Sequence, residues 1–242
     1  YIQSVDRMFV FGGSLACSSG NFGRDTWTFD FSAMRWQRMN PSGPLPRALA
    51  GILTAYDPNT GLVFLHDLQH LYSYDFSRDA YTRLSTTGVQ FGYHMNATID
   101  PKRRKFVIVG WDREANAGRV YEYDIGSGSN YLVRQIQTSG GSTVVRTYYP
   151  GIDYDPVSDR IVAWSEDSPN LVYSLDLDSR TWTSQSFAGG PTPAGNGTHG
   201  RWKYSAESGV FVLVNRVDQN VRVLRLGAPA AKPNPPTQFG VQ

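Results

Sequence analysis

A short pattern that returns at nearly constant spacing constrains the fold of this chain more than any other feature. Each copy has alternating strand-forming residues, then an acid, a hydrophobic residue and a polar turn, and an aromatic ring follows the acid by six or seven residues. The copies lie at 27–36, 72–81, 121–131 and 173–182, and a decayed fifth copy at 221–226 has Arg225 in place of the acid. Successive acid positions are 45, 49, 52 and 49 residues apart. This regular self-similarity predicts a fold built from repeated supersecondary units.

A second pattern precedes the first in every unit. It is a short apolar run, found at 8–11, 62–65, 106–109, 161–164 and 210–214. Runs of this length are typical of strands that are buried on both faces. A polar turn, Asp-Pro in three cases, stands before four of the runs, at 56–61, 99–104, 154–159 and 204–209. Because Asp and Pro favour the first two positions of a type I turn, each unit is predicted to be a set of four antiparallel strands.

Four antiparallel strands every 45 to 52 residues describe the blade of a β-propeller. We therefore predict an all-β propeller of four-stranded antiparallel blades over residues 1–226, with about five blades visible. The 24 Gly and 14 Pro leave little room for long helices. A β-sandwich is the alternative fold, but sandwiches rarely repeat so regularly.

The two ends of the repeat are incomplete, which leaves the closure of the ring open. The first unit lacks an inner strand and the last lacks an outer one. Either residues 1–5 supply that outer strand and close the ring, or the chain is a fragment of a six- or seven-bladed ring. Residues 227–242 are rich in Pro, and we expect them to form a linker or the start of a following domain.

The best-preserved unit carries the sequence Phe-Val-Phe-Gly-Gly at 9–13, followed by Trp27, Asp30 and Trp36. This unit resembles the kelch repeat, as found in the central domain of galactose oxidase, and the resemblance implies a propeller. In the other units the glycine pair is replaced, at 66–67, 109–110, 165–166 and 215–216. The tryptophans at the repeat positions, Trp27, Trp36 and Trp182, are expected to lie in the core.

The segments that lead into the inner strands should meet at the channel mouth. Alignment on the turns makes four residues equivalent: Gly51, His94, Tyr149 and His199. Arginines near them can pair with a carboxylate in bidentate fashion, and Tyr or His can move a proton. This set suits β-elimination of a uronic-acid polymer, with His94, Tyr149 or His199 as base and acid and with Arg146 and Arg201 as carboxylate clamps. The competing interpretation is that these residues pack the channel wall.

A binding surface in the same region would require fewer precisely placed residues than a catalytic site. Phe22 and Trp111 lie on glycine-rich loops, at 14–23 and 111–118, of the composition common in protein and sugar contacts. Further residues beside the channel segments are candidates for ligand contacts: Arg47, Tyr93, Tyr148 and Trp202. Our first hypothesis is a non-catalytic recognition module that binds a protein or a polysaccharide. A polysaccharide lyase is the second hypothesis, and a fragment of a galactose-oxidase-like oxidase is the third.

Several functional classes are disfavoured by composition. A net charge of +2 without a basic run argues against nucleic-acid binding, and no apolar run is long enough to span a membrane. Cys17 is the one cysteine, and we expect His66 and His70 to be exposed beside a hairpin. We therefore predict no metal site and no cofactor. We expect an extracellular or cell-envelope monomer tethered to another domain.

Two tripeptides, at 96–98 and 196–198, match the N-glycosylation pattern. They bear on function only if the chain is secreted from a eukaryote.

Overall fold

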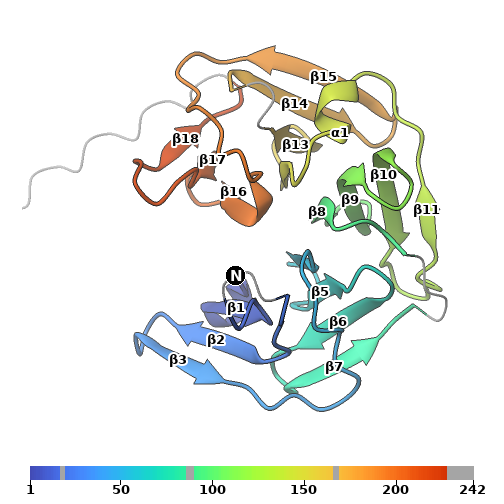
Figure 1. The fold of residues 1–242 in the computed structure, drawn as a ribbon, viewed down its shortest axis with the longest axis vertical. Coiled ribbons are helices and arrows are strands. Elements are labelled where there is room, and N and C mark those ends of the chain that lie inside the picture. Colours follow the sequence, from blue (N-terminus) through green and yellow to red (C-terminus); the bar gives the residue numbers. More distant parts are fainter. Residues whose placement is uncertain (17–19, 86–89, 166–168, 228–242) are drawn as a thin grey trace, which may run out of the picture.

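The computed structural model places five antiparallel sheets around a central opening, and it describes residues 1–16, 20–85, 90–165 and 169–227 (Figure 1). The strands of sheets 1 and 2 are β1 (Arg7–Phe11), β2 (Thr26–Asp30) and β3 (Arg35–Arg38), then β4 (Leu53–Tyr56), β5 (Val63–His66), β6 (Leu71–Asp75) and β7 (Ala80–Arg83). Sheet 3 contains β8 (His94–Asp100), β9 (Lys105–Asp112), β10 (Ala117–Asp124) and β11 (Val133–Gln135). Sheets 4 and 5 contain β12 (Gly151–Asp155), β13 (Arg160–Trp164), β14 (Leu171–Asp176) and β15 (Thr181–Ser186), then β16 (Trp202–Ser205), β17 (Val210–Leu213) and β18 (Arg222–Leu224).

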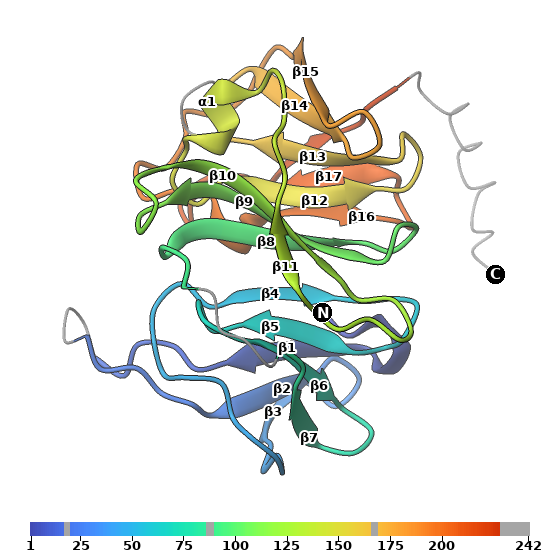
Figure 2. The ribbon, with the colours of Figure 1, turned by 90° about the vertical axis from the view of Figure 1, so that its right-hand side faces the viewer.

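The arrangement is a five-bladed β-propeller, as the repeat predicts. In each four-stranded sheet the strands follow chain order from the centre outward, and the inner strands β4, β8, β12 and β16 lie side by side (Figure 2). Helical structure among the described residues is confined to single turns: η1 (Gln3–Val5), α1 (Ser142–Val145) and η2 (His199–Arg201). Within the same ranges, no helix has the length and apolar character needed to cross a lipid bilayer.

Side chains from facing sheets form the core, and sheets 2, 3 and 4 bury apolar side chains on both faces. Phe64 of sheet 2 packs against Phe106 of sheet 3 with ring centroids 6.5 Å apart, and Val109 and Ile161 belong to the cluster between sheets 3 and 4. The apolar runs of the second strands supply these residues, and Phe106, Val109 and Ile161 have no exposed surface. Burial of each such side chain contributes about 1.5–3 kcal/mol to folding.

The recurring acids form turns, as predicted. The Asp100 carboxylate accepts the backbone N–H groups of Lys102 and Arg103, each at 2.9 Å, and Asp176 accepts those of Asp178 and Ser179. The same geometry recurs at the remaining positions of the repeat, Asp30, Asp57, Asp75, Asp124 and Asp155. These carboxylates are therefore structural.

The segment that leaves one sheet binds the outer strand of the next. The Ser42 N–H donates to the carbonyl of Asp79 and the Ser42 carbonyl accepts from Tyr81, each at 2.9 Å. Ser139 repeats the pattern, because its N–H donates to Arg180 at 3.0 Å and its carbonyl accepts from Trp182 at 2.9 Å. These linkers cover the rings of the outer strands, so Tyr81 and Trp182 are buried.

The expectation that all the repeat tryptophans are core residues is wrong for Trp36. Trp182 is 4% exposed, as predicted, and Trp27 is half-buried, but Trp36 is 51% exposed. Trp36 occupies the same position of its sheet as Trp182, yet no described segment runs over β3. Trp36 is therefore more exposed than Trp182 because no described linker packs over it, although the two residues have equivalent positions in their strands.

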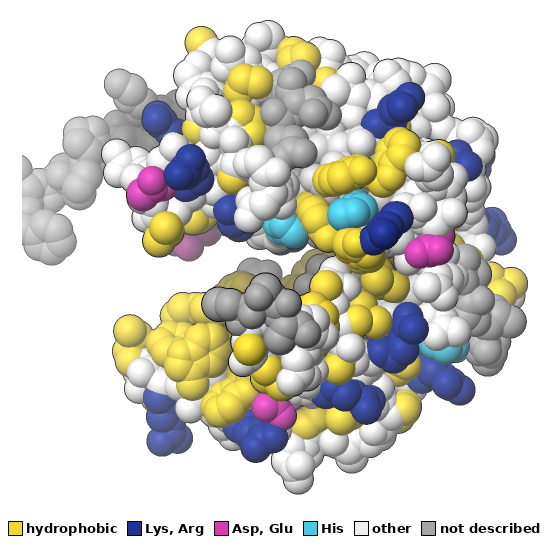
Figure 3. All heavy atoms as spheres, viewed as in Figure 1, with side chains coloured by type: hydrophobic (Ala, Val, Ile, Leu, Met, Phe, Trp, Pro, Cys, Tyr) yellow, Lys and Arg dark blue, Asp and Glu magenta, His cyan; other side chains and the backbone are white. Residues whose placement is uncertain are grey.

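Of the two alternatives for ring closure, the structure does not show the one in which residues 1–5 extend the last sheet. Ile2 bridges Arg7 of sheet 1 and is fully buried in the cluster that contains Val63 and Tyr74 of sheet 2. Residues 3–5 form η1 and not a strand. Sheets 1 and 5 consequently face each other across the opening without strand pairing (Figures 1 and 3).

Ion pairs between arginines and aspartates connect neighbouring sheets at the turns on one face of the ring. The Arg104 guanidinium in sheet 3 forms two hydrogen bonds of 2.6 Å to Asp57 in sheet 2, whose side chain is fully buried. Arg103 donates to Asp100 in its own turn and to Asp159 and Asp178 in two turns of sheet 4. Bidentate arginine–carboxylate pairs are among the stronger polar contacts, so this face has a fixed geometry.

We expect Arg104→Met to destabilise the protein by about 3–5 kcal/mol, because it leaves a buried carboxylate without its cation. The measurement is chemical denaturation followed by circular dichroism. The matched control is Arg78→Met, which removes an ion pair to Asp75 from a side chain that is 81% exposed. The control should cost no more than about 1 kcal/mol. Equal effects of the two substitutions would contradict the proposed role of the buried pair.

The same pair should make stability depend on acid. Burial alone would raise the pKa of Asp57, but hydrogen bonds from Arg104 and Thr60 outweigh it and hold the pKa below the ordinary 3.8. The stabilisation is therefore complete above the unfolded-state pKa and is lost as the pH falls through the lower folded-state pKa. Between about pH 5 and 2, the unfolding free energy should fall less steeply for Arg104→Met than for the unmodified protein. Parallel slopes in denaturation series would rule this out.

Candidate functional site

The segments that lead into the inner strands meet on one face of the ring, as the alignment of the turns predicts. The Tyr149 N–H donates to the carbonyl of His94, and the Tyr149 carbonyl accepts from His199, each at 2.9 Å. Gly51, Tyr149 and His199 share a left-handed backbone, with φ of 75°, 49° and 53°. Because that conformation is costly for a residue with a Cβ, the two aromatic side chains are held there by their surroundings.

Aromatic rings from sheets 3, 4 and 5 form a continuous surface on this face. His94 stacks on Tyr148 with centroids 4.2 Å apart and planes 7° from parallel, and Tyr149 stacks on His199 at 4.0 Å. The His94 and Tyr149 rings are 5.1 Å apart edge to face, and they join the two stacks. We call the whole set the aromatic cluster: Tyr93, His94, Trp111, Tyr148, Tyr149 and His199. In Figure 3, histidine and hydrophobic side chains gather beside a basic side chain at the rim of the opening.

A hollow of about 270 Å³ lies at the outer side of the aromatic cluster, between Trp111 and Arg146. Trp111 is half-buried, pairs in register with His94 and approaches Tyr148 at 6.2 Å. The Arg146 guanidinium lies over the Trp111 ring, 5.6 Å from its centroid. Among the described residues, no carboxylate or carbonyl accepts a hydrogen bond from this guanidinium. The hollow therefore combines an apolar platform with a cation that has no counter-ion.

A second arginine borders the cluster from the β9–β10 loop. Arg113 lies over the Tyr93 ring at 5.0 Å and donates to the Tyr93 hydroxyl. With Arg146 it places two positive charges at one edge of the ring surface.

Asn96 holds the cluster's three segments together. Its Nδ2 donates to the carbonyls of Pro150 at 2.9 Å and His199 at 2.7 Å, and its Oδ1 accepts the Ala97 N–H. Both amide hydrogens are used, so a glycan on this nitrogen would break the contacts to sheets 4 and 5. The glycosylation pattern at 96–98 therefore falls on a structural asparagine.

Burial shifts the pKa values of His94, Tyr149 and His199 in the direction that favours their uncharged forms. Desolvation, with the nearby Arg113, lowers the pKa of His94. Desolvation also lowers the pKa of His199 and exceeds the opposing effect of its hydrogen bond to the Asn196 carbonyl. Burial raises the pKa of Tyr149 to about 12. The charge offered to a ligand therefore comes from the arginines.

The structure places four predicted residues outside the cluster. Arg201 uses its guanidinium on the carbonyls of Thr198, Asn215 and Gly197. Arg47 is engaged with Asp67 in sheet 2. Trp202 is buried between Trp164 and Phe211, and Phe22 is half-buried in a bridge to Ser14.

The histidines do not form a metal site among the residues that the structure describes, where no group of three potential ligands occurs. Tyr149 lies between His94 and His199. The expectation that His66 is exposed is wrong, because its side chain is fully buried. Its Nε2 atom shares a 2.8 Å hydrogen bond with the Tyr123 hydroxyl, and burial lowers its pKa to about 3. Cys17, which the oxidase hypothesis would use, lies outside the described residues.

Comparisons with known proteins give no relative from which a function could be carried over. No protein-family description matches the sequence, and no curated protein shows significant similarity to it.

Two residues of this face were not predicted from the sequence. Arg113 stands in the loop that carries Trp111, and an Arg two positions from an aromatic is too common a signal to single it out. Asn96 looks like an ordinary strand residue, because its partners lie 54 and 103 residues away in the chain.

We expect Asn96→Ala to lower the unfolding free energy by about 1–3 kcal/mol, because two carbonyls lose their donor. The near-ultraviolet circular dichroism of the stacked rings should weaken at the same time. Asn59→Ala is the matched control, since it removes a single exposed amide contact, to the Pro101 carbonyl at 2.8 Å. A near-ultraviolet spectrum unchanged by Asn96→Ala would refute its role in ordering the rings.

Proposed function

We propose that the protein is a non-catalytic recognition module that binds an acidic polysaccharide on the aromatic cluster. The observation that carries this proposal is the Arg146 guanidinium, which lies over the Trp111 ring beside the stack of His94 and Tyr148 and has no acceptor within the described ranges. Aromatic faces bind the apolar faces of sugar rings, and an arginine without a partner binds a carboxylate. A uronic-acid unit presents both of these features.

The rigidity of the surface supports binding. The backbone of Tyr149 is hydrogen-bonded to His94 on one side and to His199 on the other, and Asn96 ties the three segments together. A surface that is already ordered loses little conformational entropy when a ligand binds. Tyr148 is 45% exposed and extends the platform from the hollow toward the central opening.

The alternative function is a polysaccharide lyase, and the direct contact of His94, Tyr149 and His199 favours it. Two features favour binding instead. Burial raises the pKa of Tyr149 to about 12, so its hydroxyl is a weak base at neutral pH. Arg201, the second expected carboxylate clamp, already donates to backbone carbonyls.

We further propose that the units are degenerate kelch-like repeats in an extracellular or cell-envelope protein tethered to another domain. The glycine pair at 12–13 supports the repeat, because a Cβ on Gly12 would stand 2.9 Å from the Gly23 carbonyl oxygen. The Pro-rich sequence after Leu226 supports the tether. Recovery of the native protein from cytosol would contradict this location.

Binding to polygalacturonate and alginate, with neutral galactan as comparison, tests the proposed function. We expect saturable binding to the acidic polymers, weakened by salt because arginines contribute. Trp111→Ala and Arg146→Ala should each weaken it about ten- to a hundredfold. The matched controls are Trp36→Ala and Arg35→Ala on β3, which remove an exposed Trp and Arg far from the hollow and should leave affinity unchanged.

Two results would overturn the proposal. One is the absence of binding to every acidic polymer. The other is release of unsaturated sugars, seen as rising ultraviolet absorbance, that is abolished in His94→Ala and Tyr149→Phe, because it would establish the lyase.

The affinity for acidic polysaccharides should change little between about pH 7 and 9, since both histidine pKa values are already lowered and the arginines stay charged.

A further inference from the structure

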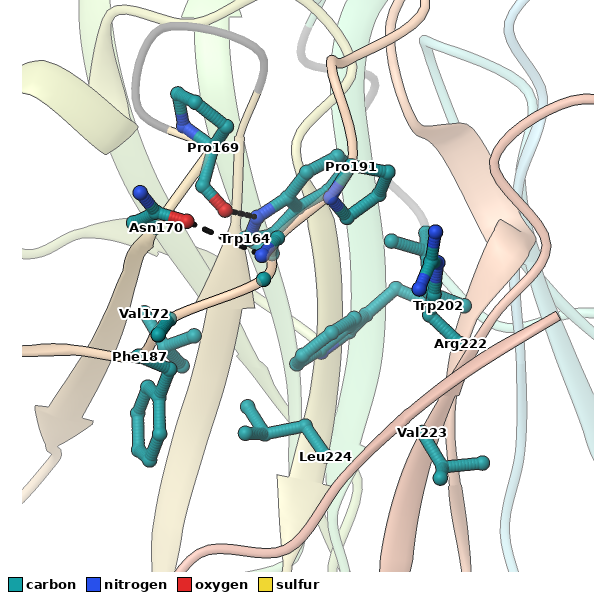
Figure 4. A pocket seen from close by; sticks show the side chains of 14 residues that line it. Trp164, Pro169, Asn170, Val172, Phe187, Pro191, Trp202, Arg222, Val223 and Leu224 are labelled. Atoms are coloured by element: carbon teal, nitrogen blue, oxygen red, sulfur yellow. Dashed lines mark hydrogen bonds between the residues drawn. The ribbon is translucent and has the colours of Figure 1, made fainter. Parts of the chain in front are cut away.

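The outer edge of β18, the last strand of sheet 5, pairs with no strand in the part of the chain that the structure describes, and an apolar groove of about 160 Å³ lies beside it. Figure 4 shows Trp164 and Phe187 on the side of sheet 4, and Trp202 and Leu224 on the side of sheet 5. Residues 187–191 form one wall and β18 forms the other. No described strand pairs with the free edge of β18.

Sheets 2 and 4 show what fills this position elsewhere in the molecule. There, a fourth strand lies between the third strand and the linker from the preceding sheet. The linker serine forms two hydrogen bonds to this fourth strand, one through its N–H and one through its carbonyl. Residues 187–191 follow β15 as Ser42 follows β3 and Ser139 follows β11. In sheet 5 the linker and the third strand are present, and the groove occupies the place of the fourth strand.

The register fixes where an aromatic side chain would lie in the groove. The buried ring of each outer strand is opposite one position of the third strand: Tyr81 is opposite Tyr74, and Trp182 is opposite Leu175. On its other side, Leu175 is opposite Ile161 of the second strand. In sheet 5 the residue in the same position is Leu224, which is opposite Phe211 of the second strand. Leu224 lines the groove, so the groove corresponds to the site of the repeat's ring.

A second, independent feature points to a missing ligand. Trp202 lines the groove and is 3% exposed, yet its indole N–H has no hydrogen-bond partner among residues 1–16, 20–85, 90–165 and 169–227. A buried donor without an acceptor costs about 1–3 kcal/mol. An acceptor such as a backbone carbonyl or a side-chain oxygen of a bound segment would remove this cost.

The charge of β18 selects the residues that flank the ring. Arg222 and Arg225 have no ion pair with any described residue, and Arg225 stands where the other sheets have Asp. In the pairing of Trp182, the residue before the ring is opposite Asp176 and the second residue after it is opposite Tyr173. The corresponding residues of sheet 5 are Arg225 and Arg222. Acids are therefore favoured directly before the ring and two residues after it.

We infer that the groove binds an extended segment of a partner polypeptide, which adds to β18 as a fourth strand and inserts an aromatic ring flanked by acids opposite Leu224. Strand addition satisfies the free backbone groups of the edge, and the groove selects the ring. A second copy of this chain does not fit through its free outer strand β3. With Trp36 opposite Leu224, Arg35 and Arg38 would face Arg225 and Arg222 as like charges.

The experiment uses the full chain and a fluorescent peptide, Ser-Asp-Trp-Thr-Asp-Ser, measured by fluorescence anisotropy. We expect saturable binding, at least tenfold weaker when Ala replaces the peptide's Trp. Arg222→Glu should weaken binding about tenfold, and a peptide with Lys in place of both Asp should regain it on this variant. Arg222 is exposed, so the substitution leaves the fold intact. Arg134→Glu, at an exposed position of β11, is the matched control and should leave affinity unchanged.

Three outcomes would overturn the inference. The first is no saturable binding at millimolar peptide, and the second is equal binding of the peptides with Trp and with Ala. The third is binding at least tenfold tighter to Phe239→Ala in the full chain, because the chain's own terminal residues would then compete for the groove. Binding of the acidic polysaccharides is independent of this site, so failure of either proposal leaves the other standing.

Discussion

Sheets 2, 3 and 4 bury apolar side chains on both faces, and the rest of the architecture depends on that constraint. A strand such as β13, with four consecutive buried residues from Ile161 to Trp164, cannot face water on either side. Each of these three sheets must therefore lie between two others, and the right-handed twist of the strands turns the stack into a ring around an opening. The two sheets at the ends of the series cannot both be covered. Their uncovered positions are where the structure departs most from its repeat, at Trp36 and at the groove beside β18.

The two faces of the ring serve different purposes. On one face, tight turns carry the recurring aspartates, and Arg103 and Arg104 bind these carboxylates across the gaps between sheets. On the other face, the segments leading into the inner strands carry the stacked rings, with Arg113 and Arg146 beside them. Because ion pairs already connect the sheets at the first face, Arg146 on the second face is not needed for such a pair, and it has no counter-ion among the described residues. The candidate binding surface thus depends on ion pairs that lie at the far ends of the same strands.

The sequence was sufficient to predict the strands and the meeting of His94, Tyr149 and His199, since both follow from a repeat with a nearly constant period. It was insufficient wherever the outcome depends on what covers a residue. Trp36 and Trp182 have the same local pattern, but only Trp182 lies under a linker. His66 looked exposed beside a hairpin and is buried because Tyr123 of the next sheet meets it. The partners of Arg201 were hidden for the same reason, as its loop folds back around the guanidinium.

The contacts of Ser42 and Ser139 give the ring a direction. In both cases the linker that leaves one sheet binds the outermost strand of the sheet that follows. Loss of sheet 1 would therefore expose the outer edge of β7, and loss of sheet 3 would expose that of β15. At these two junctions, the stability of an outer strand depends on the sheet that precedes it in the chain.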